Sequence, residues 1–187
     1  MTTIKKSFGI LTLLSAVAAL GGCSKSVDGA TESSTPTSPS APSSSASSAE
    51  GSLTGLNQCD LLDQALAGQG FPPAKPTVAD SKRTCGSQKL PPSGSSAPSV
   101  VVALSLQSGQ RYTDNVNHPE TARTGHIKKR ASIEQPAPLG ISGGCQINMA
   151  VGENSRVLVV VTSGSDTDGA CKMAANVAAA VEPKLPA

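Results

Sequence analysis

Four stretches of the chain have the apolar pattern of β-strands. In "CQINMAV" (145–151) every second residue is apolar, and "RVLVVVT" (156–162) follows after the turn-forming residues 152–155. These two stretches together predict a β-hairpin. "VVVALSL" (100–106) is almost continuously apolar, which predicts a central strand with both faces covered, and "RTCGSQKL" (83–90) predicts a short strand.

Two other stretches have the spacing of amphipathic helices. The first begins at the N-cap Asn57 and ends before Gly68 and Gly70. Its apolar face consists of Leu61, Leu62, Ala65 and Leu66. The second begins near Asp166 or Asp168 and ends at Pro183, with one apolar stripe. That stripe consists of Met173, Val177 and Val181. Strands and helices in this order predict an α+β fold, an antiparallel sheet with helices packed on one face.

Residues 110–132 show neither the apolar alternation of a strand nor the apolar spacing of a helix. They contain the one dense basic cluster of the chain. This cluster consists of His126, Lys128, Lys129 and Arg130. It is either a binding surface for an acidic partner or anionic head groups, or a solvated loop or edge strand that its charge protects from aggregation. The second interpretation is the favoured one. His118 and Glu120 are likewise interpreted as loop residues and not as a metal site.

The N-terminal residues read as an export signal followed by a tether. Two lysines precede an apolar run over 8–20 that is too short to span a bilayer, and small residues follow it. Residues 23–52 are rich in Ser, Pro and Thr, a composition that cannot bury enough apolar surface to fold. We therefore divide the chain into a signal peptide (1–22), a disordered tether (23–52) and one α+β domain (53–187).

Leu20-Gly21-Gly22-Cys23 resembles the lipobox of bacterial lipoproteins. The resemblance implies that the thiol of Cys23 accepts a diacylglyceryl group and that Cys23 becomes the mature N-terminus. Two acyl chains on one residue suffice for stable anchoring, so we expect the protein on the extracytoplasmic face of the cell membrane. The alternative is an ordinary signal peptide with an incidental cysteine.

Charge argues against nucleic acid as a partner. Removal of residues 1–22 lowers the number of Lys and Arg residues from 15 to 13, which equals the 13 Asp and Glu residues. A formally neutral mature chain lacks the basic excess of a nucleic-acid binder. No cofactor or metal motif stands out, so we expect neither.

Four further cysteines predict disulfide bonds in an exported domain. The chain has no Trp, and an aliphatic core of this kind gains from covalent links. Three pairings are open, but equal separations of 26 residues favour Cys59 with Cys85 and Cys145 with Cys171. A four-cysteine zinc site is the alternative, although it would normally have two Cys-x-x-Cys pairs, which are lacking here.

The motifs around these cysteines resemble a family of actinobacterial cell-envelope lipoproteins. They are "NQCDLL", "CGSQ", "GCQI" and "CKMAANVAAAVEPKLP", and the resemblance spans residues 57–186. It implies an exported, disulfide-bonded lipoprotein with a domain of unknown function and no known activity. The family typically has a Trp two residues after its second domain cysteine, where this chain has Ser87.

Two short motifs have a chemical and a structural interpretation. Gly140-x-Ser142-x-Gly144 matches a hydrolase nucleophile elbow, but a predicted strand follows the serine, and both histidines precede it. A tight turn is the better interpretation. The Asp166-x-Asp168-Gly169 motif resembles part of a calcium loop, but the outer ligand positions fall on residues without side-chain oxygens, so a helix cap is favoured.

The sequence therefore favours a non-catalytic binding or accessory module for an envelope protein. The partner would be recruited through an exposed patch around residues 110–132. A carrier of a small lipid or amphiphile is the alternative, and it would need a cavity between sheet and helices that can bury an acyl chain. A serine hydrolase ranks third.

Overall fold

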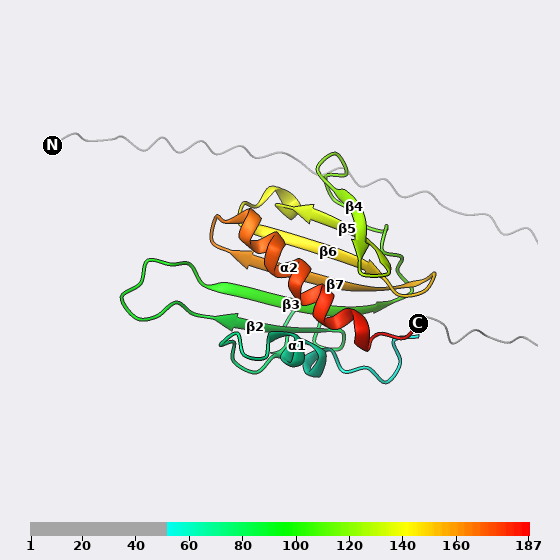
Figure 1. Ribbon diagram of the computed structural model, residues 1–187, viewed down its shortest axis with the longest axis horizontal. Helices are drawn as coiled ribbons and strands as arrows, with labels where there is room; N and C mark the ends of the chain where they lie inside the picture. The colour runs from blue at the N-terminus through cyan, green and yellow to red at the C-terminus, as the bar shows by residue number, and fades with distance from the viewer. Residues whose placement is uncertain (1–51) are drawn as a thin grey trace, which may run out of the picture. The chain divides into compact units, whose positions relative to one another are not determined.

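The computed structural model describes residues 52–187, in which seven strands form one antiparallel sheet (Figure 1). The spatial order is β1-β2-β3-β7-β6-β5-β4. The strands are β1 (Lys75–Pro76), β2 (Thr84–Lys89), β3 (Val100–Ser108), β4 (Arg123–Ile127), β5 (Arg130–Pro136), β6 (Gly144–Ala150) and β7 (Ser155–Ser163). The predicted hairpin is confirmed as β6 and β7, and β7 and β3 occupy the centre of the sheet.

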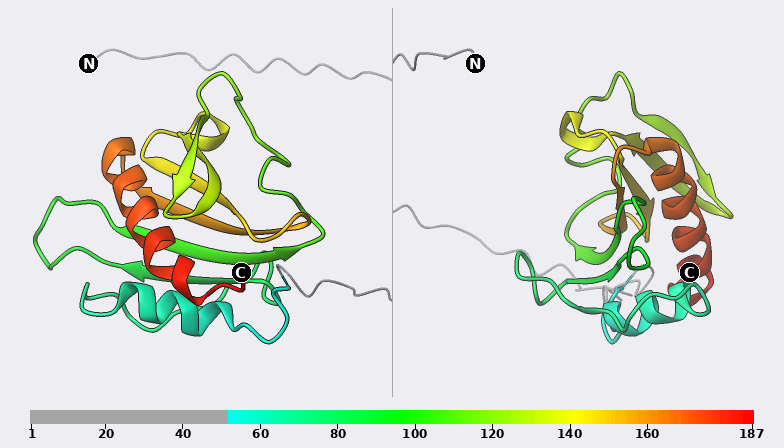
Figure 2. Two further views of the ribbon diagram at one scale, coloured as in Figure 1. Left: turned by 45° about the vertical axis from the view of Figure 1, so that its right-hand side comes forward. Right: turned by 90° about the vertical axis from the view of Figure 1, so that its left-hand side faces the viewer.

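Two α-helices pack on one face of this sheet, which confirms the predicted α+β class (Figure 2). Helix α1 (Gln58–Leu66) begins at Asn57, whose Oδ1 accepts hydrogen bonds from the N–H groups of Cys59 and Asp60. Helix α2 (Thr167–Val181) begins at Asp166, whose Oδ1 accepts from the N–H of Gly169 at 2.8 Å. Both caps satisfy N–H groups that the first helical turn leaves unpaired.

Aliphatic side chains fill the space between the helices and the sheet. The strands contribute fully buried residues such as Val102, Leu104, Val157, Val159 and Val161. The buried face of α2 consists of Ala170, Cys171, Ala174, Val177, Ala178 and Val181. The small alanine side chains allow α2 to lie close to the strands. Met173, which the sequence placed in this stripe, is only partly buried, because the stripe is centred on the alanines.

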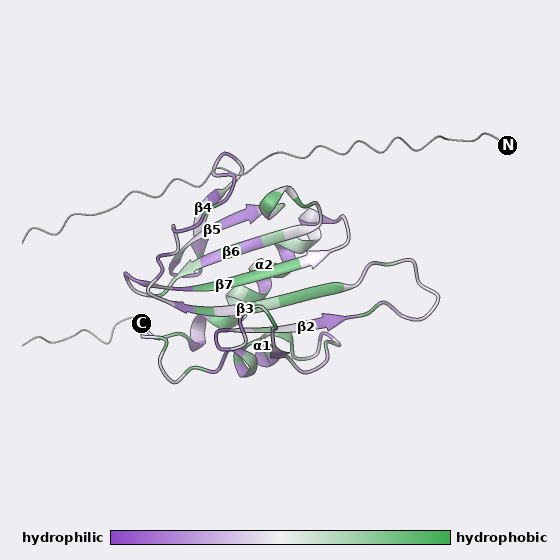
Figure 3. Cartoon of the chain, turned by 180° about the vertical axis from the view of Figure 1, so that it is seen from behind, coloured by the Kyte–Doolittle hydropathy of each residue, from purple (hydrophilic) through white to green (hydrophobic). Residues whose placement is uncertain are grey.

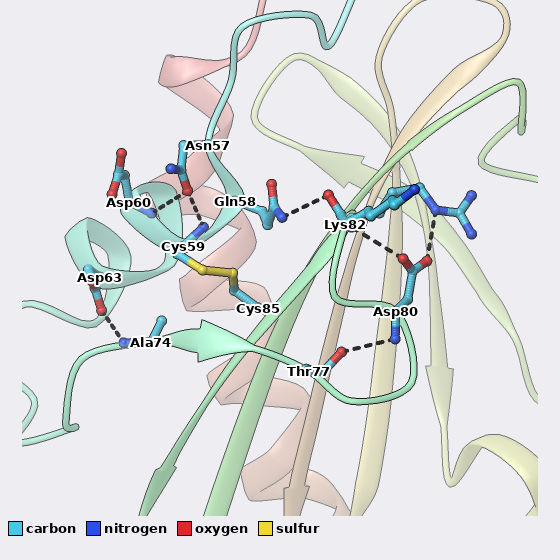
Figure 4. The surroundings of a disulfide bond; sticks show 11 residues. Asn57, Gln58, Cys59, Asp60, Asp63, Ala74, Thr77, Asp80, Lys82 and Cys85 are labelled. Carbon is cyan, nitrogen blue, oxygen red and sulfur yellow. Dashed lines mark hydrogen bonds and ion pairs between the residues drawn. A yellow bond between two sulfur atoms is a disulfide. The ribbon is translucent and has the colours of Figure 1, made fainter.

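Both predicted disulfides are present, and each joins a helix to a strand. Cys59 in the first turn of α1 is bonded to Cys85 of β2, with Cα atoms 5.1 Å apart (Figure 4). Cys145 of β6 is bonded to Cys171 of α2, with Cα atoms 4.9 Å apart. The two bonds therefore attach each helix to the face that it covers, and the four thiols are not free to bind zinc.

A long loop covers one end of the opposite face of the sheet (Figure 3). This β3–β4 loop, residues 109–122, is held by Arg156 of β7. Its guanidinium donates to the main-chain oxygens of Arg111 and Asp114 and to the side-chain oxygens of Gln107 and Gln110. Burial lowers the pKa of Arg156, although the nearby Asp114 carboxylate partly opposes this effect. The pKa of Asp114 is also lowered, chiefly because the N–H of Arg111 donates to its carboxylate.

The rest of that face is less covered. Val101 and Ala103 of β3 are partly exposed there, whereas Val102 and Leu104 on the helix side are fully buried. The prediction that both faces of this strand are covered is therefore correct only in part, because the helices pack on one face alone.

Candidate functional site

The predicted basic cluster lies in a β-hairpin formed by β4 and β5, at one edge of the sheet. The register pairs Ile127 with Arg130, so Lys128 and Lys129 form a two-residue turn. Lys128 has a φ of +52°, the left-handed conformation that such turns require. The sheet is twisted, so the direction of β4 is strongly inclined to that of β3 (Figures 1 and 2).

Three members of the cluster are exposed to solvent: His126 at the end of β4, and Lys128 and Lys129 in the turn. Residues 123–136 contain four Lys or Arg residues and a single acidic residue, Glu134. Glu134 already pairs with Arg123 at 3.0 Å. The solvent side of the hairpin therefore carries an excess of positive charge.

Arg130, the fourth member, points inward and has a structural role. Its side chain is 14% exposed, its Nε lies 3.5 Å from Oε1 of Glu182, and its Nη2 donates to the main-chain oxygens of Leu185 and Pro186. Lys128 reaches the same carboxylate at 4.0 Å. Arg130 thus attaches the hairpin to the segment after α2, and the exposed patch consists of His126, Lys128 and Lys129.

A groove with a volume of about 290 Å³ runs between the hairpin and α2. Ala175 of α2 forms one wall, Gly125 and Ile127 of β4 form the other, and Ile147 of β6 contributes to the floor. The groove exists because α2 lies over the centre of the sheet and leaves the helix side of β4 exposed. Arg123, Ser132 and Glu134 also line the groove. Its small and aliphatic part favours an apolar side chain as occupant.

A second hollow, of about 230 Å³, adjoins the groove near the beginning of α2. The carboxylate of Glu134 and the sulfur atoms of Cys145 and Cys171 lie within 4.8 Å of one another there, a spacing that can suit a metal ion. Both sulfurs belong to one disulfide, so they cannot act as thiolate ligands.

The two short motifs have the structural roles that were favoured from sequence. Ser142 is exposed between the short 3₁₀ helix η1 (Pro138–Gly140) and β6, so the helix that a nucleophile elbow requires after the serine is replaced by a strand. Gly143 has a φ of +77° and donates its N–H to Oγ1 of Thr167 at 2.8 Å. Asp166 caps α2, and Ala175, the twelfth position of the calcium motif, lies inside that helix.

Ser87, where the resemblance implies a Trp, is 5% exposed in β2. Its hydroxyl donates to the main-chain oxygen of Pro72 at 2.6 Å. A short polar contact thus occupies the position. This hydrogen bond joins β2 to the 72–76 segment without an aromatic ring.

The predicted lipidation residue Cys23, the predicted signal peptide and most of the predicted tether lie outside the residues that the structure describes. Among residues 52–187, no helix has the length and apolar character needed to cross a bilayer.

The fold and the site define a disulfide-linked antiparallel α+β domain with a cationic hairpin at one edge. Residues 18–184 match the model of a family described as protein of unknown function (DUF3558), and the chain belongs to this family. The expected relation to a domain of unknown function is thereby confirmed. No curated protein and no solved structure matches the chain.

Proposed function

We propose that the chain is an actinobacterial-type cell-envelope lipoprotein, anchored through Cys23, whose domain is a non-catalytic binding or accessory module for an envelope protein. The observation that carries this proposal is the cationic hairpin at the sheet edge. His126, Lys128 and Lys129 are exposed there, on a domain whose helices are covalently attached to the sheet. A rigid scaffold that presents charges in fixed positions is suited to recognition of a partner.

The lipobox-like sequence before Cys23 and the polar residues 24–52 support the anchor. As a flexible coil, the predicted tether of about 29 residues would have a root-mean-square reach of roughly 30 Å, which would let the domain meet partners near the membrane. The lipid carrier is less well supported. In the described part of the chain, the space between sheet and helices is filled by side chains such as Leu62, Leu104 and Val177, all with 0% exposure.

The test is in-cell cross-linking of the full-length chain, followed by mass spectrometry of the attached proteins. Cys23→Ala, which removes the acceptor thiol, is the control. We expect the wild-type chain in the membrane fraction with one recurrent envelope protein attached, and the variant in the soluble fraction with that protein lost or reduced. Membrane retention of Cys23→Ala would refute the anchor, and a purified domain with bound lipid but no recurrent protein would favour the carrier.

A further inference from the structure

The two edges of the sheet differ in whether they can accept another strand. The edge strand β1 has only two residues and ends at Pro76, which lacks an N–H. At the other edge, β4 has five residues. Along β4, residues 123, 125 and 127 are paired with Glu134, Ser132 and Arg130 of β5, and Thr124 and His126 lie between these pairs. Because a two-residue hairpin closes on a hydrogen-bonded pair, the main-chain N–H and C=O groups of Thr124 and His126 point away from β5.

The groove lies on the helix side of the sheet between β4 and α2, next to the positions that the side chains of an added strand would take. Arg123, Gly125 and Ile127 face the helix side of the sheet, and the neighbouring position of a paired strand faces the same side. Gly125 leaves open space, since a Cβ atom built on it would have no neighbour within 4 Å. One apolar side chain of the added strand can therefore enter the groove between Gly125, Ile127 and Ala175.

The positive charges beside β4 favour an acidic partner over a second copy of the chain. Lys128 and Lys129 are exposed in the turn after β4, whereas Arg123 at the start of β4, although its side chain is 67% exposed, already pairs with Glu134. A second copy of the chain would bring two hairpins of the same excess charge together, which opposes self-pairing. Acidic side chains beside the inserted apolar residue would instead meet the opposite charges of Lys128 and Lys129.

We propose that β4 is a docking edge for an extended, acidic protein segment, which adds to the sheet as an eighth strand through Thr124 and His126 and places one apolar side chain in the groove beside Gly125. This is recognition by strand addition, in which the main chain provides the shared hydrogen bonds and the groove provides specificity. The inference rests on the proposed accessory function and specifies the chemistry of the partner.

The test uses the full-length chain in detergent and a synthetic peptide of about seven residues, the length of a typical strand. The peptide has two valines flanked by glutamates, with blocked ends, and a matched peptide has lysines in place of the glutamates. We expect the acidic peptide to bind and to slow amide exchange at Thr124 and His126. We expect binding to weaken with added salt and the lysine peptide not to bind.

Two variants separate strand addition from general charge attraction. Gly125→Leu fills the groove and keeps every charge, and Thr124→Pro removes an N–H that the β4–β5 pair does not use. Each should weaken peptide binding by about tenfold or more, which is roughly the effect of losing one good contact. Lys75→Glu, a charge reversal at the other edge, is the matched control and should leave the affinity unchanged.

Equal binding by wild type, Gly125→Leu and Thr124→Pro would overturn the inference, as would dimerisation through β4. Binding of phosphatidylglycerol vesicles by the patch without peptide binding would also overturn it, in favour of a membrane contact. If in-cell cross-linking finds a partner that both variants still recruit, the docking edge is wrong and the accessory function stands. If the peptide binds as expected but no envelope protein is found, the accessory function fails while the docking chemistry stands.

Discussion

Arg156 of β7 is a buried cation that connects the sheet to the β3–β4 loop. It is 4% exposed, and four of its contacts lie in or beside the β3–β4 loop, residues 109–122. Gln135 of β5 adds a further contact by donating to the main-chain oxygen of Asn117. The loop that leads into β4 is thus fixed to the sheet through polar side chains. Ser105 and Asn148, whose side chains lie on the same face of the sheet, are also buried.

Replacement of Arg156 should release this loop. Arg156→Met keeps the length of the side chain but leaves buried oxygens without a donor, so we expect a loss of about 2 to 3 kcal/mol in the free energy of unfolding. Chemical denaturation measures the loss, and hydrogen exchange should show faster exchange in residues 109–122. Arg111→Met, which changes an exposed arginine of the loop itself, should have little effect. Equal destabilisation by both variants would contradict the role given to Arg156.

Two glycines near Ser142 differ in how closely the main chain of another segment approaches them. Both Gly140 and Gly143 have positive φ angles, but a Cβ on Gly143 would clash with the main chain of Gly164, whereas one on Gly140 has open space. Gly140→Ala should therefore cost about 1 kcal/mol for the backbone conformation alone, and Gly143→Ala distinctly more. Thermal unfolding of the two variants measures the difference. Similar unfolding temperatures would show that the clash relaxes without cost.

At the scale of elements, each disulfide fixes one helix to the sheet. Each closes a chain segment with a sequence separation of 26 residues, which in the chain-entropy model corresponds to about 3.5 kcal/mol. We expect Cys59→Ala/Cys85→Ala and Cys145→Ala/Cys171→Ala to lower the free energy of unfolding by similar amounts. Denaturant titration of the two double variants measures this. A much larger effect for one pair would show that its bond also corrects local packing.

The same scale shows why the sequence predicted most elements but not β4 and β5, the strands that carry the candidate site. Strands β3, β6 and β7 lie against α2 or in the centre of the sheet, so most of their buried positions are apolar. This pattern of apolar positions is what made them predictable from sequence. In β4, four of five residues are exposed, and the buried positions of β5 include Ser132 and Gln135. Polar residues at buried positions remove the alternation on which a strand prediction depends. Figure 3 shows this contrast, with β4 and β5 drawn as hydrophilic and β3 and β7 with hydrophobic stretches.

The charges of the site could be found from sequence, but their grouping could not. His126, Lys128, Lys129 and Arg130 are adjacent in the chain, which suggested one basic surface. The structure directs Arg130 toward Glu182, a contact between residues that are far apart in sequence. Ala175 of α2 likewise forms the groove with Gly125 only through the tertiary fold. Contacts of this kind leave no local pattern.

At the scale of the whole molecule, the protein that we propose has a lipid anchor, a tether and a domain with one sheet edge open to a further strand. Removal of the predicted signal peptide would leave equal numbers of basic and acidic residues, so the cationic hairpin is a local feature and not part of a general positive charge. Local charge next to unpaired main-chain groups favours a defined protein contact over diffuse attraction to polyanions. We therefore propose that the protein would meet an envelope partner through β4.

The most direct measurement is photo-cross-linking in cells, with a photoreactive residue placed at His126 of β4 or at Lys75 of β1 in the full-length chain. Both positions are exposed and lie on opposite edges of the sheet. We predict that the His126 position captures one recurrent envelope protein, that Gly125→Leu abolishes this capture, and that the Lys75 position captures no such protein. Capture of the same protein from both edges, or from Lys75 alone, would contradict the claim.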